Sequence, residues 1–201
     1  YLGFFIQFDE APLALLTVVV RILALAAFAY CEEYVFRRKI TRDLMKQVRG
    51  HKPPTMSTGV ITAAIVALIY CGIKSLQFDL GIMQLCTLFL ISVALSIQGM
   101  IEGDFGRGAG FWAALLIVFQ PLLSLPALGG DFSGLVLIKY QGPPVGAAID
   151  SGGDALARLL TGGAGGPLSS LALQMLLALN IARGLFVYKK KHGIPLTKSL
   201  G

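Results

Sequence analysis

Five stretches of about 20 apolar residues constrain this chain more than any other feature. A helix needs about that length of mainly apolar sequence to cross the hydrocarbon core of a bilayer. None of the stretches shows the two-residue alternation of a membrane β-strand, so helices are expected. The sequence therefore predicts an all-α integral membrane protein, a polytopic transmembrane helix bundle forming one domain over residues 1–201. Its spans are expected near residues 11–31, 56–76, 82–101, 110–130 and 167–188.

The composition agrees with a membrane protein. Hydrophobic residues make up 55% of the chain and charged residues only 14%, whereas about a quarter of the residues of a soluble domain are charged. The first eight residues, YLGFFIQF, read as the end of an earlier apolar segment. They suggest a sixth span at the N-terminus, and a chain that begins with Tyr1 is expected to be part of a longer or processed polypeptide.

The net charge of +6 comes from basic residues that flank the apolar stretches. Such residues usually contact anionic lipid and fix topology, so membrane lipids are the expected partners and nucleic acid is not. Residues 37–53 carry the densest group. Within it, four side chains are predicted to contact lipid headgroups: Arg38, Lys39, Arg42 and Lys46.

The distribution of lysine and arginine predicts the orientation. In a scheme of five alternating spans, twelve of these residues fall on one side and three on the other, namely Lys74, Lys139 and Arg158. The positive-inside rule then places the 37–53 loop and the C-terminus in the cytoplasm. Residues 131–166 become an extracytoplasmic loop, in which residues 147–160 have the pattern of a short amphipathic helix.

Charged residues at the end of the first apolar stretch are the candidate site. In AFAYCEEYVFRRK, residues 27–39, Glu33 and Arg37 are four apart and can form an ion pair on one helix face. Glu32 points about 100° away. Arg21 lies near mid-depth, where a charge must face the bundle interior, a partner or a water-filled cavity, and the glutamates are candidate partners. Two adjacent carboxylates could alternatively supply a general acid or base.

Other polar residues and the cysteines give weaker signals. Each intramembrane polar residue is expected to form interhelical hydrogen bonds; these residues are Gln98, Gln120, Ser124, Gln174 and Asn180. The chain has no C-x-x-C pair, and its cysteines are expected to behave as small buried hydrophobic residues. No metal site and no cofactor is predicted.

The Glu-Glu-x-x-x-Arg pattern resembles the first motif of the CAAX prenyl endopeptidase and bacteriocin-processing family of intramembrane glutamic proteases. Here it reads Glu32-Glu33-Tyr34-Val35-Phe36-Arg37, and the later stretch GRGAGFWAALLIVFQ resembles the lead-in to the family's last catalytic helix. The resemblance covers roughly residues 12–130. It implies a membrane helix bundle in which a glutamate activates a water and histidines on two later helices complete the site.

The chain departs from this family at the histidines. His51 and His192 are its two histidines, and both lie outside the apolar stretches. The positions that should carry the catalytic histidines offer Tyr70 and Gln120 instead. The favoured hypothesis is therefore a non-catalytic membrane subunit with a CAAX-protease-like fold, packed among other membrane protein subunits in a larger complex.

Two alternatives stay open at this stage. One is an active intramembrane protease that uses Glu32 or Glu33 with a partner such as Tyr70 or Gln120, or with a histidine from another chain. The other is a small transporter or proton-handling protein built around Arg21 and the two glutamates.

Overall fold

The computed structural model describes residues 4–5, 12–50, 55–102, 106–118, 139–140, 156, 159 and 167–192. Its α-helices are α1 (Pro12–Glu33), α2 (Thr41–Arg49), α3 (Met56–Gln77), α4 (Ile82–Glu102), α5 (Gly106–Ile117) and α8 (Leu171–His192). A π-helix (Tyr34–Ile40) joins α1 to α2, and a 3₁₀ turn (Pro167–Ser169) precedes α8. The strand β1 (Phe4–Phe5) pairs antiparallel with β2 (Lys139–Tyr140).

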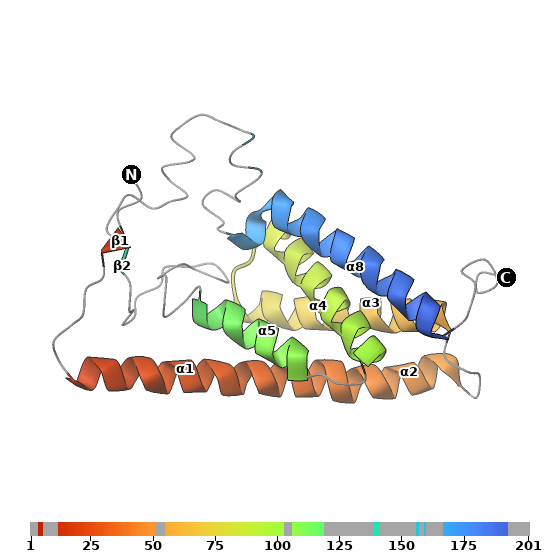
Figure 1. Cartoon of the computed structure of the whole chain (residues 1–201), viewed down its shortest axis with the longest axis horizontal. Helices are drawn as coiled ribbons and strands as arrows, with labels where there is room; N and C mark the ends of the chain where they lie inside the picture. Colours follow the sequence, from red (N-terminus) through yellow and green to blue (C-terminus); the bar gives the residue numbers. More distant parts are fainter. Residues whose placement is uncertain are drawn as a thin grey trace.

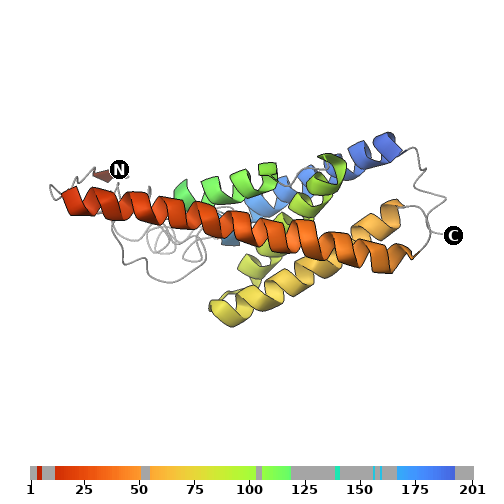
Figure 2. The ribbon, with the colours of Figure 1, turned by 90° about the horizontal axis from the view of Figure 1, so that it is seen from below.

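The first three helical elements form one long helix from Pro12 to Arg49, which runs beneath all the others (Figures 1 and 2). At 1.5 Å per residue it is about 57 Å long. The wider π turn ends where the Thr41 amide and hydroxyl both donate to the Phe36 carbonyl, the hydroxyl at 2.8 Å. The expectation of a loop over residues 37–53 is thus wrong as far as Gly50, which ends the helix with a φ of 56°.

The start of α3 follows from its sequence. Thr55 and Thr58 form a reciprocal capping box, in which each side-chain oxygen accepts a hydrogen bond from the other residue's backbone N–H. These bonds satisfy amide groups that have no partner within the helix. The expected spans 56–76 and 82–101 coincide with α3 and α4 to within one residue at each end.

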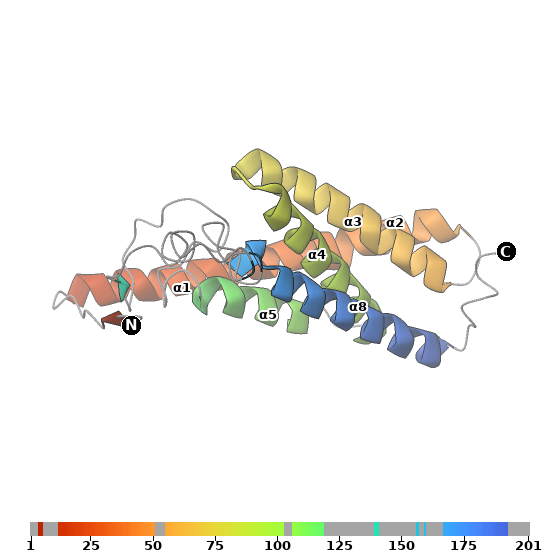
Figure 3. The same cartoon turned by 90° about the horizontal axis from the view of Figure 1, so that it is seen from above.

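Two groups of helices form the body of the structure. Helix α4 lies between α3 and α8, and α5 lies along α1 (Figures 1 and 3). Helix α8 approaches α4 closely at Gly184, where an added Cβ would lie 3.1 Å from Ile97 Cγ2. The core between the two groups takes residues from several helices, including Phe36, Val66, Tyr70, Leu88, Ile91, Leu95, Trp112 and Leu116.

Among the described residues, three helices are long and apolar enough to cross a membrane: α3, α4 and residues Leu171–Lys190 of α8. Many large apolar side chains on these helices are exposed, among them Leu68, Ile82 and Leu176, as expected of surfaces that face lipid. The prediction of a helical protein is confirmed, and these helices have the length and composition that a multi-pass membrane protein requires.

The remaining expectations fall partly outside the described residues. Helix α5 starts within the expected lead-in to the span near 110–130, but the structure describes that span only to Val118. Of the expected amphipathic helix over 147–160 it describes Leu156 and Leu159, both exposed. Of the expected sixth span near residues 1–8 the structure describes Phe4–Phe5, which form a strand; the rest lies outside the described residues.

Candidate functional site

The candidate site is a buried group of charged and aromatic side chains where α1, the π-helix, α3 and α5 meet. Three pairs of residues four apart on one helix face supply most of it: Glu33 with Arg37, Tyr70 with Lys74, and Gly108 with Trp112. This spacing puts both members of a pair on the same side of a helix. Side chains from α3 and α5 converge on Glu32 of α1.

Glu32 is bound by donors from two other helices. Its Oε1 forms an ion pair with Lys74 Nζ. Its Oε2 accepts hydrogen bonds from the Tyr70 hydroxyl at 3.3 Å and from Trp112 Nε1 at 2.9 Å. The Glu32 side chain is 12% exposed and that of Lys74 only 1%. One cation and two neutral hydrogen-bond donors therefore surround the Glu32 carboxyl group.

Glu33 lies on an adjacent face of the same helix end. Its Oε2 lies 3.9 Å from Arg37 Nε, a long ion pair, and both residues are buried. Gly108 of α5 lies directly against the other oxygen, since a Cβ at that position would be 2.7 Å from Glu33 Oε1. A glycine at this point is therefore what allows α5 to approach the carboxylate.

Both cations of the cluster lie over aromatic rings. The Arg37 guanidinium carbon is 4.6 Å from the Tyr70 ring centroid, and Lys74 Nζ is 4.8 Å from that of Phe28 and 5.5 Å from those of Tyr70 and Phe78. Cation–π contacts partly replace the water that a buried charge loses. We name these residues the charge cluster: Glu32, Glu33, Arg37, Tyr70, Lys74 and Trp112.

The structure brings together some of the predicted site residues and not others. Glu32, Glu33 and Arg37 lie in the charge cluster. Arg21 is half-buried on α1, and among the described residues no ion pair joins it to either glutamate. The cationic partner of Glu32 is Lys74 instead.

Lys74 was expected in an extracytoplasmic connection, and this expectation is wrong. The residue lies within α3 and is buried. Sequence reasoning also assigned no role to Trp112. For Lys74, however, the sequence did contain a signal. Tyr70 and Lys74 are polar residues four apart near the end of an otherwise apolar stretch, which places them on one helix face. Tyr70 itself was named as a partner for the glutamates, and Gln120 lies outside the described residues.

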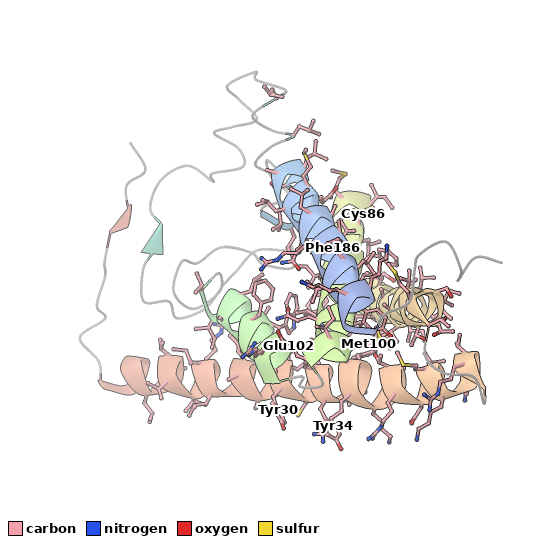
Figure 4. The ribbon with its side chains drawn as sticks, turned by 45° about the vertical axis from the view of Figure 1, so that its right-hand side comes forward. Tyr30, Tyr34, Cys86, Met100, Glu102 and Phe186 are labelled. Atoms are coloured by element: carbon pink, nitrogen blue, oxygen red, sulfur yellow. The ribbon has the colours of Figure 1, made fainter. Side chains whose placement is uncertain are left out.

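The four residues expected at lipid headgroups are all exposed on the long helix: Arg38, Lys39, Arg42 and Lys46. Tyr30 and Tyr34, on its outer side, point away from the other helices (Figure 4). Contact of this side with headgroups is not tested by the structure and stays a prediction.

The other polar expectations have mixed outcomes. Gln174 does form an interhelical contact, since its Nε2 donates to the Met83 carbonyl and to Thr87 Oγ1, both at 3.1 Å. Gln98 donates to Glu102 on its own helix. The cysteines are free thiols, and the expectation that they are buried is wrong for Cys31 and Cys86, which lie on outward-facing helix surfaces.

Comparisons with known proteins give no relative: no protein-family model, no curated protein and no solved structure matches the chain significantly. The resemblance to the CAAX endopeptidase family therefore stays a prediction that rests on the two sequence stretches alone. In the described part of the chain, no group of three or more His, Cys, Asp or Glu residues is placed to hold a metal ion.

Proposed function

We propose that the protein is a non-catalytic, multi-pass membrane subunit with a CAAX-protease-like helix bundle, which packs with other membrane proteins in a larger complex. The observation that carries this proposal is the environment of Glu32. A carboxylate that activates a water needs a free oxygen lone pair directed at that water. Instead, Glu32 Oε1 forms an ion pair with Lys74, and Glu32 Oε2 accepts hydrogen bonds from Tyr70 and Trp112.

The second glutamate supports the same conclusion. Its Oε1 has no hydrogen-bond partner among the described residues, but Glu33 is only 2% exposed and Gly108 lies against this oxygen, which limits access for a water. The charge cluster holds two acidic and two basic side chains, so its formal charges match in number. It links three helices in addition to the π-helix, and such buried ionic groups can select one packing arrangement over others.

An active intramembrane protease is the second candidate. The observation in its favour is the hydrogen bond from the Tyr70 hydroxyl to Glu32, because a hydroxyl so placed could exchange a proton with the carboxylate. A transporter or proton-handling protein comes third. It would require Arg21 to act with the glutamates, and no ion pair of the described residues connects them.

The double variant Glu32→Gln with Glu33→Gln separates the first two candidates. It keeps size and most hydrogen-bonding capacity but removes both negative charges, and an amide cannot act as a general base. A subunit is expected to lose stability and association, while no precursor protein accumulates in cells. Glu102→Gln is the matched control, since Glu102 forms an exposed ion pair with Arg107. Normal assembly together with a specific uncleaved precursor would overturn the proposal.

The finer topology also belongs to this proposal. To the three apolar helices it adds α1 and the segment that continues α5, which makes five spans. With Lys74 buried in α3, only Lys139 and Arg158 oppose the basic cytoplasmic side, so the charge asymmetry that favours a cytoplasmic C-terminus becomes larger.

A further inference from the structure

Helix α8 packs on the rest of the chain along one side only. It is one of the three helices able to cross a membrane, yet few residues of its apolar segment are buried, whereas more than half of those of α4 are. Its inner side contacts α4, and its outer side carries large exposed residues such as Phe186 (Figures 3 and 4). A spanning helix with so little contact leaves a broad surface for lipid or for another protein.

Four exposed residues form a stripe along this outer side: Leu176, Asn180, Arg183 and Val187. Their spacing of four, three and four residues is that of a helix–helix packing seam. We call these residues the α8 seam. Its two polar members lie at the centre and its two apolar members at the ends, an arrangement that a lipid-facing surface does not require.

The polar members lie too deep to reach water easily. Asn180 is at the middle of Leu171–Lys190, and its short amide cannot extend to either boundary. Arg183 lies one turn further on, but helical side chains lean toward the N-terminus, which directs Arg183 away from the nearer membrane boundary. Neither side chain has a partner within the described part of the chain. Polar groups at this depth normally face other protein groups.

We propose that the α8 seam binds a transmembrane helix of another membrane protein that carries a carboxylate near mid-depth. Arg183 pairs with that carboxylate, the Asn180 amide donates a hydrogen bond to it, and Leu176 and Val187 pack above and below. The inference rests on the proposed function as a membrane subunit and specifies its docking surface and the chemistry of its partner.

A second copy of this chain does not fit the seam as well. Two copies inserted in the same direction would pack their α8 helices in parallel, which places the two Arg183 guanidinium groups at the same depth. Like charges at close range in a low-dielectric medium repel strongly. The charge of Arg183 therefore favours an acidic partner over self-association.

The test uses the full chain in lipid nanodiscs with a fluorescent leucine–alanine transmembrane peptide that has one glutamate at its centre. A peptide with leucine at that position is the control. The glutamate peptide is expected to bind about tenfold more tightly than the leucine peptide, and Arg183→Leu or Asn180→Leu should remove that advantage, on the scale of interhelical polar contacts in lipid. Met175→Leu, which is exposed on α8 outside the seam, should leave binding unchanged.

A photo-crosslinking residue at Val187 then identifies the natural neighbour in native membranes. The expected product joins a different protein that has an acidic residue within a transmembrane helix. A crosslink to a second copy or within the same chain overturns the seam proposal, as does equal binding of both peptides. If the chain then still co-migrates with other membrane proteins, the proposed function stands without the seam, whereas migration as a free monomer in mild detergent refutes the proposed function.

Discussion

Replacing Lys74 by methionine should destabilise the protein more than any other single change in the charge cluster. Methionine matches the length of the lysine stem but cannot pair with Glu32, which keeps hydrogen bonds from Tyr70 and Trp112 only. Removing one partner of a buried ion pair costs about 3–5 kcal/mol, because the other charge stays buried without compensation. The Glu32 side chain retains 12% exposure, so we expect a loss of about 3 kcal/mol in the free energy of unfolding.

The reciprocal change, Glu32→Gln, should lower the free energy of unfolding by somewhat less than Lys74→Met does. In Glu32→Gln the amide oxygen can still accept hydrogen bonds, and the unpaired Lys74 ammonium keeps the rings of Phe28, Tyr70 and Phe78 near it. Contacts of this kind contribute up to about 2 kcal/mol for a desolvated cation, so the expected loss is about 2 kcal/mol. In the double variant Glu32→Gln with Lys74→Met, neither charge of the pair remains to be compensated. Its loss in the free energy of unfolding should therefore be far smaller than the sum of the losses in the two single variants.

The assay is reversible unfolding in mixed micelles of increasing denaturing detergent, followed by tryptophan fluorescence. Trp112 is the one tryptophan of the chain and donates to Glu32, so its emission reports on the cluster directly. Lys46→Met, on the exposed side of α2, is the control and should leave the midpoint unchanged. A Lys74→Met protein as stable as the wild type, or single losses that simply add in the double variant, would refute the argument.

The close contact at Gly108 predicts that Gly108→Ala lowers the unfolding free energy by about 1–3 kcal/mol, since its Cβ meets a buried carboxylate oxygen. Gly110→Ala on the same helix meets open space and should be neutral or stabilising by up to about 1 kcal/mol; equal effects of the two would contradict the packing. Thr41→Val should cost about 1 kcal/mol in the same unfolding assay by removing the hydroxyl bond at the π turn. For the topology, a cysteine at Ser151 should be labelled in intact cells and one at Lys46 should not, and the reverse pattern would refute the orientation.

Interactions between residues close together in the sequence account for the features that could be predicted from it. The apolar stretches place α3 and α4 to within one residue at each end, because about 20 consecutive apolar residues are stable across a bilayer only as a helix. The Glu33–Arg37 contact follows from a spacing of four on one helix. Both features depend on residues close together in the sequence.

The rest of the site depends on packing between distant segments. No local pattern joins Glu32 to Lys74 or to Trp112, which come from separate helices. The helix over 41–49 did have a signal, since Ile40, Leu44 and Val48 recur every four residues, but the basic residues between them suggested a loop. Ile40 and Leu44 in fact pack against the core.

The contact between Glu32 and Lys74 also constrains the depth of the charge cluster. Five alternating spans would place Glu32 at the cytoplasmic boundary and Lys74 near the opposite one, since Lys74 lies about 27 Å along α3 from Met56. An ion pair requires both side chains to be at a similar depth, so we infer that the first span extends beyond residue 31. The first helix instead continues to Arg49, with α2 packed beside α3. The glutamates then belong to the interior of the bundle, where one unpaired charge costs several kcal/mol. Arg37 and Lys74 supply one cationic partner for each glutamate, and these pairs allow the cluster to hold the helices together.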